Sequence, residues 1–209
     1  MTPYYDHDGV TIYHGDCREV LPQLGVFDLL LTDPPYGIGV TRMQLGPRAA
    51  KPLYRGGDWD DVPVDLTFLL GRCPAEVIWG GNHFRLPPAR GWLVWDKRNG
   101  TTSFADCELA WSSLDMPCRK YERQWIGAHA KERAEDDRWH PTQKPVDLMA
   151  WCIGLAGDVQ TVLDPFAGSG TTGLAARKLG KRATLIEMDE RYCEITATRL
   201  QQRELFGVA

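Results

Sequence analysis

The chain has 209 residues, of which 43% are hydrophobic and 25% charged, and its 24 basic and 28 acidic side chains give a formal charge of −4. This composition is typical of one globular domain, which we expect to span residues 1–209. No apolar run reaches the roughly 18 residues that a membrane-spanning helix needs, and residues 1–10 lack a basic-then-apolar secretion signal. We therefore expect a cytoplasmic protein with no membrane partner.

The cysteines and the net charge indicate which metals, disulfides and partners to expect. The six cysteines are widely spaced and form no C-x-x-C pair, so reduced thiols are favoured over disulfides or a zinc site, and we expect no metal. The mild acidity argues against a nucleic-acid partner unless the basic residues are unevenly distributed along the chain.

Strand-like and helix-like segments alternate along the chain, which is typical of a parallel sheet with helices on its faces. Short apolar runs predict strands at residues 26–31, 77–79, 92–95, 109–112, 161–163 and 183–186. Apolar residues at helical spacing predict helices at residues 145–155, 172–179 and 190–202. The last third of the chain therefore predicts a βαβ unit, and the whole predicts an α/β fold.

A glycine-rich turn follows the strand expected at residues 161–163. Its sequence from Asp164 to Thr172 is DPFAGSGTT, in which Gly168 and Gly170 allow a tight turn and the close approach of a ligand. The free amides at the start of the next helix suit an anionic or polar group, and Glu187 ends the next expected strand, where a carboxylate can accept ribose hydroxyls. These features predict a site for an adenosine-containing cofactor, although neither a complete G-x-G-x-x-G pattern nor a Walker P-loop is present.

A second turn, Asp33-Pro34-Pro35-Tyr36, follows the strand expected at residues 26–31. Open α/β sheets bind their ligands at the carboxyl ends of strands. The Asp33 carboxylate and the Pro34 carbonyl are hydrogen-bond acceptors, and Tyr36 presents a flat aromatic face. An exocyclic amine on a nucleobase needs two acceptors and its ring needs a stacking surface, so this turn is a candidate base-binding site.

In this combination the sequence resembles the amino-group DNA methyltransferases that use S-adenosylmethionine, in the branch whose catalytic motif precedes the cofactor motif. The matching segments are HGDC at 14–17, TDPPY at 32–36, WGGN at 79–82, WDK at 95–97, HPTQKP at 140–145, the turn at 164–172 and Glu187. The resemblance implies a Rossmann-like, mostly parallel sheet with helices on both faces and a permuted motif order. It also implies S-adenosylmethionine as cofactor and double-stranded DNA as substrate.

The resemblance assigns one set of residues to the cofactor. They are Asp16, Cys17, Thr142, Lys144, Asp164, Phe166, Gly168, Ser169, Gly170, Thr171 and Glu187. Asp164 and the glycine-rich turn would hold the methionine part, Glu187 the ribose and Asp16 the adenine amine. Lys144 would be the cationic partner of the cofactor carboxylate.

The resemblance also implies a catalytic role for the turn of Asp33, Pro34, Pro35 and Tyr36. Asp33 and the Pro34 carbonyl would accept hydrogen bonds from the target amine and orient its lone pair, and Tyr36 would stack on a base flipped out of the duplex. A sulfonium methyl is already activated, so no cysteine attack is needed, which disfavours a cytosine-C5 mechanism.

The basic residues gather in two irregular stretches, residues 37–58 and 116–139, whose length is typical of functional or disordered loops. Residues 37–57 carry four basic side chains and no acidic one. We expect these loops to face DNA phosphates, with solvated flexible loops as the alternative. The candidate DNA-binding residues are Arg42, Lys51, Arg55, Arg98, Arg119, Lys120 and Arg123.

The leading hypothesis is a DNA adenine-N6 methyltransferase, since Asp rather than Ser at position 33 favours adenine. The alternatives are a cytosine-N4 DNA methyltransferase, an RNA or protein N-methyltransferase, whose members usually have Asn at this position, and a non-catalytic DNA-binding module. Related enzymes carry a separate target-recognition domain, whereas this chain offers only its loops, and the sequence leaves monomer and homodimer open.

Overall fold

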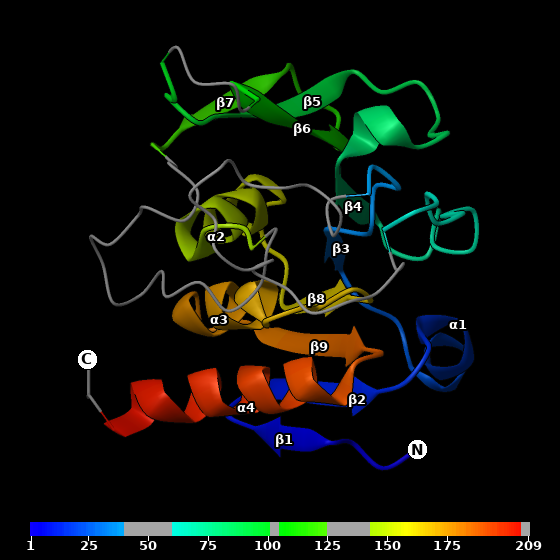
Figure 1. Ribbon diagram of the computed structural model, residues 1–209, viewed down its shortest axis with the longest axis vertical. Helices are drawn as coiled ribbons and strands as arrows, with labels where there is room; N and C mark the ends of the chain where they lie inside the picture. Colours follow the sequence, from blue (N-terminus) through cyan, green and yellow to red (C-terminus); the bar gives the residue numbers. More distant parts are fainter. Residues whose placement is uncertain (40–59, 101–104, 125–142, 206–209) are drawn as a thin grey trace.

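The computed structural model describes residues 1–39, 60–100, 105–124 and 143–205. Within these residues one nine-stranded sheet has the order β1-β2-β9-β8-β3-β4-β6-β5-β7 (Figure 1). The strands are β1 (Tyr5–His7), β2 (Val10–His14), β3 (Leu29–Thr32), β4 (Ala75–Trp79), β5 (Gly91–Asp96), β6 (Cys107–Ser112), β7 (Arg119–Glu122), β8 (Thr161–Asp164) and β9 (Arg182–Glu187). The helices are α1 (Cys17–Val20), α2 (Val146–Leu155), α3 (Thr171–Lys178) and α4 (Glu190–Leu205), with 3₁₀ turns at Leu21–Gln23 and Gly81–His83.

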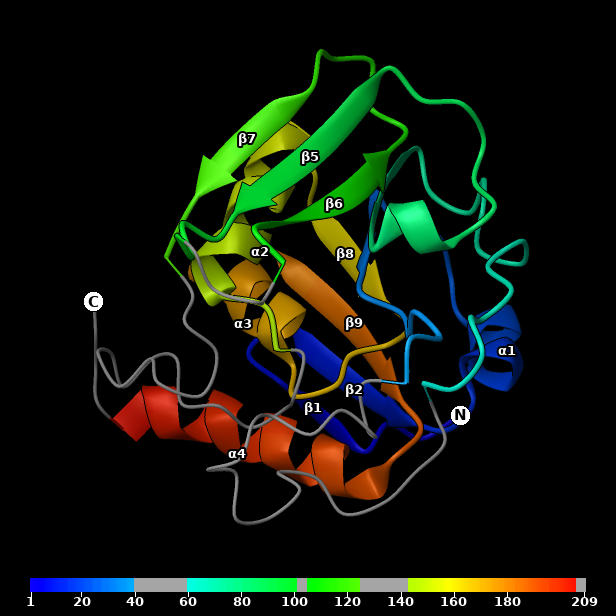
Figure 2. The same cartoon turned by 45° about the horizontal axis from the view of Figure 1, so that its top comes forward.

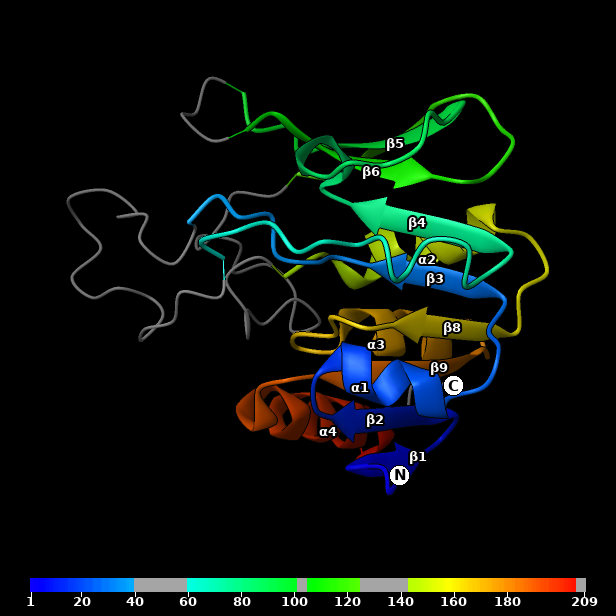
Figure 3. The same ribbon diagram turned by 90° about the vertical axis from the view of Figure 1, so that its right-hand side faces the viewer.

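The direction of the strands decides where their ends meet. The central strands β2, β9, β8, β3 and β4 run parallel. β6 lies antiparallel between β4 and β5, and β7 pairs with β5 in parallel, so β5 and β7 point the same way as β4. Figure 3 shows β6 running against β4, β3, β8 and β2. The carboxyl ends of all these parallel strands and the amino end of β6 therefore meet at one edge, which we call the carboxyl edge.

The sheet separates two hydrophobic cores. On one face α2, α3 and α4 pack through buried residues that include Leu148, Leu174 and Leu200. On the other face α1 packs beside irregular chain from the segment before β4, which contributes Leu66 and Leu69. The layer of β5, β6 and β7 continues the sheet over α2 (Figure 2). The ring centroids of Tyr121 in β7 and Trp151 in α2 lie 5.3 Å apart. The predicted α/β fold with a mostly parallel sheet and helices on both faces is confirmed.

The predicted elements are found within a few residues of their expected bounds. The helices expected at residues 145–155 and 172–179 are α2 and α3, and β8, α3 and β9 form the expected βαβ unit. The strand expected at residues 26–31 is β3, which begins later. Val26 is 93% exposed, and the Asp28 carboxylate accepts hydrogen bonds from the Gln160 and Thr161 backbone amides instead of continuing an apolar run.

The prediction of an irregular stretch at residues 116–139 is wrong for its first part, because residues Arg119–Glu122 form β7. This strand lies at the end of the sheet order and pairs only with β5 among the described strands. Three of its four residues are charged, which is how proteins protect a sheet edge from further pairing. The charged side chains replace the alternating apolar residues from which a strand would be predicted.

The structure also adds β1, β2 and α1 before residue 26, where no element was expected. In β2 the buried residues Val10 and Ile12 alternate with less buried ones, but a period of two over such a short segment is a weak pattern. Asp16 begins α1 as its N-cap, accepting a hydrogen bond from the Arg18 amide. The carboxyl end of β2 thereby joins the carboxyl edge.

The cysteines are free thiols, of which Cys107 and Cys118 are exposed and the other four are buried. Among the helices of the described ranges, none has the length and apolar character that a bilayer crossing requires.

Two helical glycines allow helix propensity to be compared with packing. No atom lies within 4 Å of where a Cβ of Gly154 would stand, so Gly154→Ala should raise the free energy of unfolding by about 0.5–1 kcal/mol. A Cβ at Gly173 would stand 2.7 Å from Leu185 Cδ1 and 3.2 Å from Val10 Cγ1. Overpacking costs about 1–3 kcal/mol, so Gly173→Ala should lower that free energy. Chemical denaturation measures both, and a stabilised Gly173→Ala variant would contradict the packing of α3 on β9 and β2.

Candidate active site

Two turns at the carboxyl edge line one hollow of about 360 Å³ that opens to solvent. One turn follows β3 and contains Asp33, and the other follows β8 and contains the glycine-rich sequence. β3 and β8 are neighbours in the sheet, so the two turns lie side by side. The lining residues are Asp33, Gln143, Lys144, Met149, Asp164, Phe166, Ala167, Gly168, Ser169, Thr171 and Thr172.

The glycine-rich turn needs its glycines for two reasons. Gly168 and Gly170 have φ values of +51° and +78°, which L side chains rarely adopt. A Cβ at Gly170 would also stand 2.2 Å from Thr196 Cγ2 of α4. Gly170 precedes the first residue of α3, so the turn leads into the amino end of that helix, where backbone amides suit a polar ligand.

Asp164 anchors the glycine-rich turn through hydrogen bonds. It is 2% exposed, and its Oδ1 accepts hydrogen bonds from Thr32 Oγ1 at 2.7 Å and the Phe166 amide at 3.1 Å. Its Oδ2 accepts one from Thr172 Oγ1 at 2.5 Å. Burial raises the pKa of Asp164 to about 6, although these donors oppose the shift. Both oxygens are thus engaged by the protein, and Asp164 shapes the hollow that it lines.

Glu187 ends β9 beside the same turn. Its Oε2 accepts a hydrogen bond from the Gly168 amide at 2.8 Å, and its Oε1 accepts one from the Asp189 amide at 2.9 Å. Burial raises the pKa of Glu187 to about 7, and the amide hydrogen bonds only partly offset this. The carboxylate therefore changes its charge near neutral pH.

Asp16 and Cys17 follow β2, the strand that pairs with β9. His14 lies opposite Glu187 in this pair, and the Gly15 amide donates to the Glu187 carbonyl at 2.9 Å. Arg18 Nη2 lies 2.5 Å from Asp16 Oδ2, and hydrogen bonds from Arg18 lower the pKa of Asp16. The structure therefore brings Asp16 and Glu187 to the ends of adjacent strands. Thr142 lies outside the described residues.

Asp33 and Tyr36 form a connected pair in the other turn. Tyr36 Oη donates to Asp33 Oδ1 at 2.5 Å, and the Tyr36 ring stacks on His83 with centroids 4.9 Å apart. Gly80 packs against the same ring, because a Cβ there would stand 2.1 Å from Tyr36 Cε1. Pro34 is buried and Pro35 half-buried. The turn after β4 thus supports the tyrosine.

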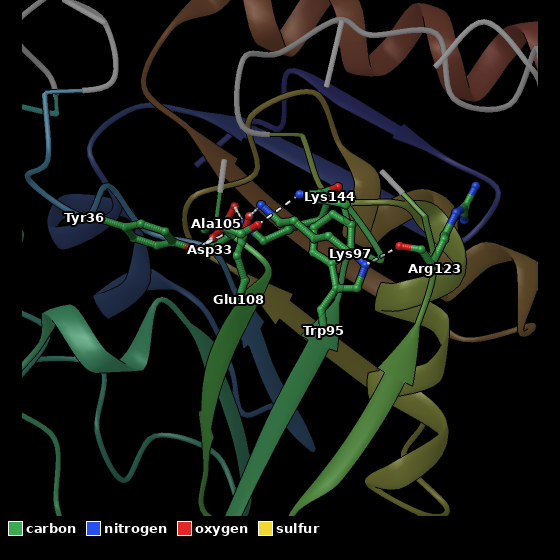
Figure 4. A network of polar contacts seen from close by, with 9 residues as sticks. Asp33, Tyr36, Trp95, Lys97, Ala105, Glu108, Arg123 and Lys144 are labelled. Carbon is green, nitrogen blue, oxygen red and sulfur yellow. Dashed lines mark hydrogen bonds and ion pairs between the residues drawn. The ribbon is translucent and has the colours of Figure 1, made fainter. Parts of the chain in front are cut away.

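Lys144 is paired with carboxylates of the protein. Its ammonium lies 2.6 Å from Asp33 Oδ2 and 2.9 Å from Glu108 Oε2, and it also donates to Tyr36 Oη at 3.1 Å (Figure 4). Burial lowers the pKa of Lys144, but the two carboxylates outweigh it and the net shift is upward. The charge that was expected to meet a cofactor carboxylate is already neutralised by carboxylates of the protein.

Burial has the opposite effect on Asp33, whose pKa it raises although Lys144 opposes the shift. A carboxylate with a raised pKa holds a proton, or a hydrogen-bond donor, more strongly than an exposed one. Asp33 is therefore suited to accept a hydrogen bond from a ligand in the hollow.

Three residues of the site have no role in the sequence analysis. Glu108 and Lys97 form an ion pair of 2.5 Å beside Lys144, and His83 stacks on Tyr36. Glu108 is the one charged residue of β6, which is a detectable feature, since a carboxylate rarely occurs within an apolar strand. Lys97 is the last residue of the WDK segment and His83 directly follows the WGGN segment, so both positions are marked by the resemblance.

The described members of the expected DNA-binding set are distributed along β5 and β7. Arg98 and Arg123 follow these strands at the carboxyl edge, whereas Arg119 begins β7. Acidic neighbours lie close to three of them: Lys120 is 2.6 Å and Arg98 3.5 Å from Glu122, and Arg123 is 3.0 Å from Asp147. Arg42, Lys51 and Arg55 lie outside the described residues. Among the residues that are described, no group of three His, Cys, Asp or Glu could hold a metal ion.

Known proteins are similar to this chain in sequence. A family model described as DNA methylase matches residues 92–198, just over half of the chain. The type II methyltransferase M.ScaI of Streptomyces caespitosus is 26% identical over 258 residues, covering 95% of this chain and 84% of that protein. The type II methyltransferase M2.LlaDCHI of Lactococcus lactis subsp. cremoris is 24% identical over 259 residues, covering 99% of this chain and 94% of that protein.

Solved structures share the fold. The M1.HpyAVI–SAM complex superposes with a TM-score of 0.54 at 20% identity, covering 91% of this chain and 99% of that one. The PvuII DNA methyltransferase, described as cytosine-N4-specific, has a TM-score of 0.60 at 14% identity, covering 94% and 88%. Because the family model matches more than half of the chain, the chain belongs to the DNA methylase family of N6 and N4 amino-group methyltransferases.

Proposed function

We propose that this chain transfers the methyl group of S-adenosylmethionine to the exocyclic amine of a DNA base, with adenine N6 as the preferred position. The observation that carries this proposal is the shared hollow, which Asp33 lines together with the glycine-rich turn. A target amine bound to Asp33 would therefore face a cofactor bound at Gly168 and its neighbours. Asp rather than Ser at position 33 is the basis for preferring adenine.

The residues around the glycine-rich turn fit an adenosine-containing cofactor. Gly168 and Gly170 form the tight turn that leads into α3, and Glu187 and Asp16 supply carboxylates at neighbouring strand ends. When bound, S-adenosylmethionine supplies a methyl group that its sulfonium has already activated. The protein has to hold this group, exclude water and align the amine with it.

The Asp33 turn would bind the target amine. The Asp33 carboxylate and the Pro34 carbonyl accept its two hydrogens, which turns the nitrogen lone pair away from the base ring. The Tyr36 ring supplies a surface for a flipped base, since the amine is inaccessible inside the stacked duplex. The pKa of Asp33, raised by burial, favours acceptance of the proton that the methylated nitrogen must lose.

We also propose that the segments 37–58 and 116–139 contact DNA, and support comes from where the described residues beside them lie. The Gly37 amide donates to Asp60 Oδ1 at 2.8 Å, and the Gly39 amide donates to the Asp60 carbonyl at 2.7 Å. The segment 40–59 therefore leaves and rejoins the described chain directly beside Tyr36. The segment 125–142 likewise connects the end of β7 to Gln143, which lines the hollow. The relatives match over 258 and 259 residues, so they carry segments that this chain of 209 residues lacks.

The test is to incubate plasmid DNA with the protein and S-adenosylmethionine, digest it to nucleosides and identify the methylated one by mass. N6-methyladenine is the expected product. N4-methylcytosine would overturn the base assignment, and no methylated nucleoside on DNA would overturn the proposed substrate.

Replacing Asp33 separates catalysis from cofactor binding. Asp33→Asn keeps the size of the side chain but removes its charge, and should lower kcat about 10²-fold or more, the usual range for a group that handles a proton. Calorimetry should find the affinity for S-adenosylmethionine nearly unchanged, because Glu187 and Asp16 are intact. Asp158→Asn, on the opposite edge of the sheet, is the matched control. If Asp33→Asn lost affinity for S-adenosylmethionine as strongly as it lost methyl transfer, the division between a catalytic turn and a cofactor turn would be contradicted.

The raised pKa of Glu187 predicts a pH dependence of cofactor affinity. Ribose hydroxyls are donors that favour the ionised carboxylate, so affinity for S-adenosylmethionine should fall as pH decreases through about 7, where Glu187 takes up a proton. Glu187→Gln should bind weakly and without this pH dependence, whereas Glu190→Gln, in the exposed first turn of α4, should behave as the unmodified chain. A pH dependence that persists in Glu187→Gln would assign it to another group.

The salt dependence of DNA binding tests the loop proposal. Each phosphate contact contributes about one unit to the slope of log affinity against log salt, so replacing Arg42 and Arg55 by Ala should lower that slope by about two. Arg90 and Arg182, at the opposite edge, provide a matched double variant that should keep the slope. Equal slopes in both double variants would remove the first loop from the DNA interface.

A further inference from the structure

Glu108 belongs to a row of alternating charges that begins at Asp33, and the proposed chemistry gives Glu108 itself no part. The row runs from Asp33 through Lys144 and Glu108 to Lys97 (Figure 4). Glu108 Oε2 lies 2.9 Å from Lys144 Nζ, and its Oε1 lies 2.5 Å from Lys97 Nζ. Burial raises the pKa of Glu108, but Lys144 and Lys97 together lower it to about 2. Glu108 is therefore an anion throughout the physiological pH range.

The sheet topology places Glu108 there. β6 runs against its neighbours, so its first residues lie at the carboxyl edge where the other strands end. Glu108 pairs with Trp95 of β5, and the Lys97 ammonium lies 5.1 Å from the centre of the Trp95 ring. Lys144 approaches from the other side, from the segment before α2.

The contacts of Lys144 show what Glu108 adds. The Lys144 ammonium donates hydrogen bonds to Asp33 Oδ2 and Tyr36 Oη, and Glu108 Oε2 lies 2.9 Å from it as its second ion-pair partner. The Lys144 side chain is only 3% exposed, so water cannot replace a lost partner easily. With Asp33 as its only anion, the ammonium would concentrate its charge there and compete with an incoming amine.

We propose that Glu108 is a positioning residue for methyl transfer, which holds the Lys144 ammonium in place and shares its charge with Asp33. Asp33 then keeps a fixed orientation while retaining capacity to accept hydrogen bonds from the target amine. Lys97 supports Glu108 from the side away from Asp33. This inference rests on the proposed function, because it assigns Glu108 a part in the same reaction.

The test compares Glu108→Gln with the unmodified chain. The variant should lose about tenfold or more in kcat, since small misplacements of reacting groups cost up to about 10²-fold, while the KM for DNA and the affinity for S-adenosylmethionine stay nearly constant. The acid limb of its pH–rate profile, which reports Asp33, should move to lower pH. The negative charge of Glu108 raises the pKa of both Asp33 and Lys144, so its removal lowers both.

Two further variants separate positioning from folding. Glu76→Gln changes another buried glutamate in the same way, but Glu76 lies in β4 and accepts a hydrogen bond from the Gly71 amide instead of facing a lysine. It should keep the pH profile whatever it costs in stability. Glu108→Asp keeps the charge and should restore the position of the pH profile, with kcat between those of Glu108→Gln and the unmodified chain. A folded Glu108→Gln with unchanged kcat and pH profile would overturn the proposal.

Should Glu108→Gln fail to fold, the double variant of Glu108→Gln with Lys97→Gln removes one charge of each sign and keeps the row neutral. It should also lose about tenfold or more in kcat, and full activity in it would overturn the proposal.

The carbon-13 resonance of the Asp33 carboxyl, followed by NMR against pH in Glu108→Gln or Glu108→Asp, reports the coupling between Glu108 and Asp33 without any substrate. A change in this titration that depends on the charge at position 108 supports the network even if the unmodified chain transfers no methyl group, an outcome that would refute only the proposed function.

Discussion

The hydrogen bond from Thr32 to Asp164 joins the two strands on which the site depends. Thr32 is the last residue of β3 and Asp164 the last of β8, and both functional turns begin at this point. The same carboxylate accepts hydrogen bonds from Thr172 and the Phe166 amide, so the start of α3 is held as well. A buried carboxylate is costly unless it is bonded in this way. The relative position of Asp33 and the glycine-rich turn therefore follows from one buried group.

The buried and half-buried acids of the site differ in the kind of donor that each one meets. Asp164 and Glu187 meet hydroxyl and amide donors, and burial raises their pKa values to about 6 and about 7. Glu108 meets two ammonium groups, and its pKa lies near 2. Neutral donors leave much of the desolvation cost of a charge in place, whereas cations remove it. The cofactor side of the hollow is therefore sensitive to pH near neutrality, and the network beside Asp33 stays ionic.

The sequence predicts the site where function depends on local turns. Asp33, Tyr36, Gly168 and Gly170 stand at the ends of apolar segments, and parallel strands bring such ends to one edge. The partners of Lys144 could not be predicted, because they depend on the order and direction of β4, β6 and β5, about which hydrophobic patterns carry no information. The same limit explains β7: whether charged residues form an edge strand depends on an available neighbour, here β5.

Electrostatic attraction to DNA has to be reconciled with a net charge of −4. Lys144 and Lys97 cannot provide it, since their side chains are 3% and 13% exposed and paired with carboxylates. Arg98 and Lys120 are paired too, but at the surface, where an ion pair contributes only about 0–1 kcal/mol and a phosphate can replace the acid. The four basic residues between 37 and 57 have no acidic neighbour in sequence within that range. An acidic chain can therefore bind a polyanion if its basic residues are concentrated in sequence next to the catalytic turn.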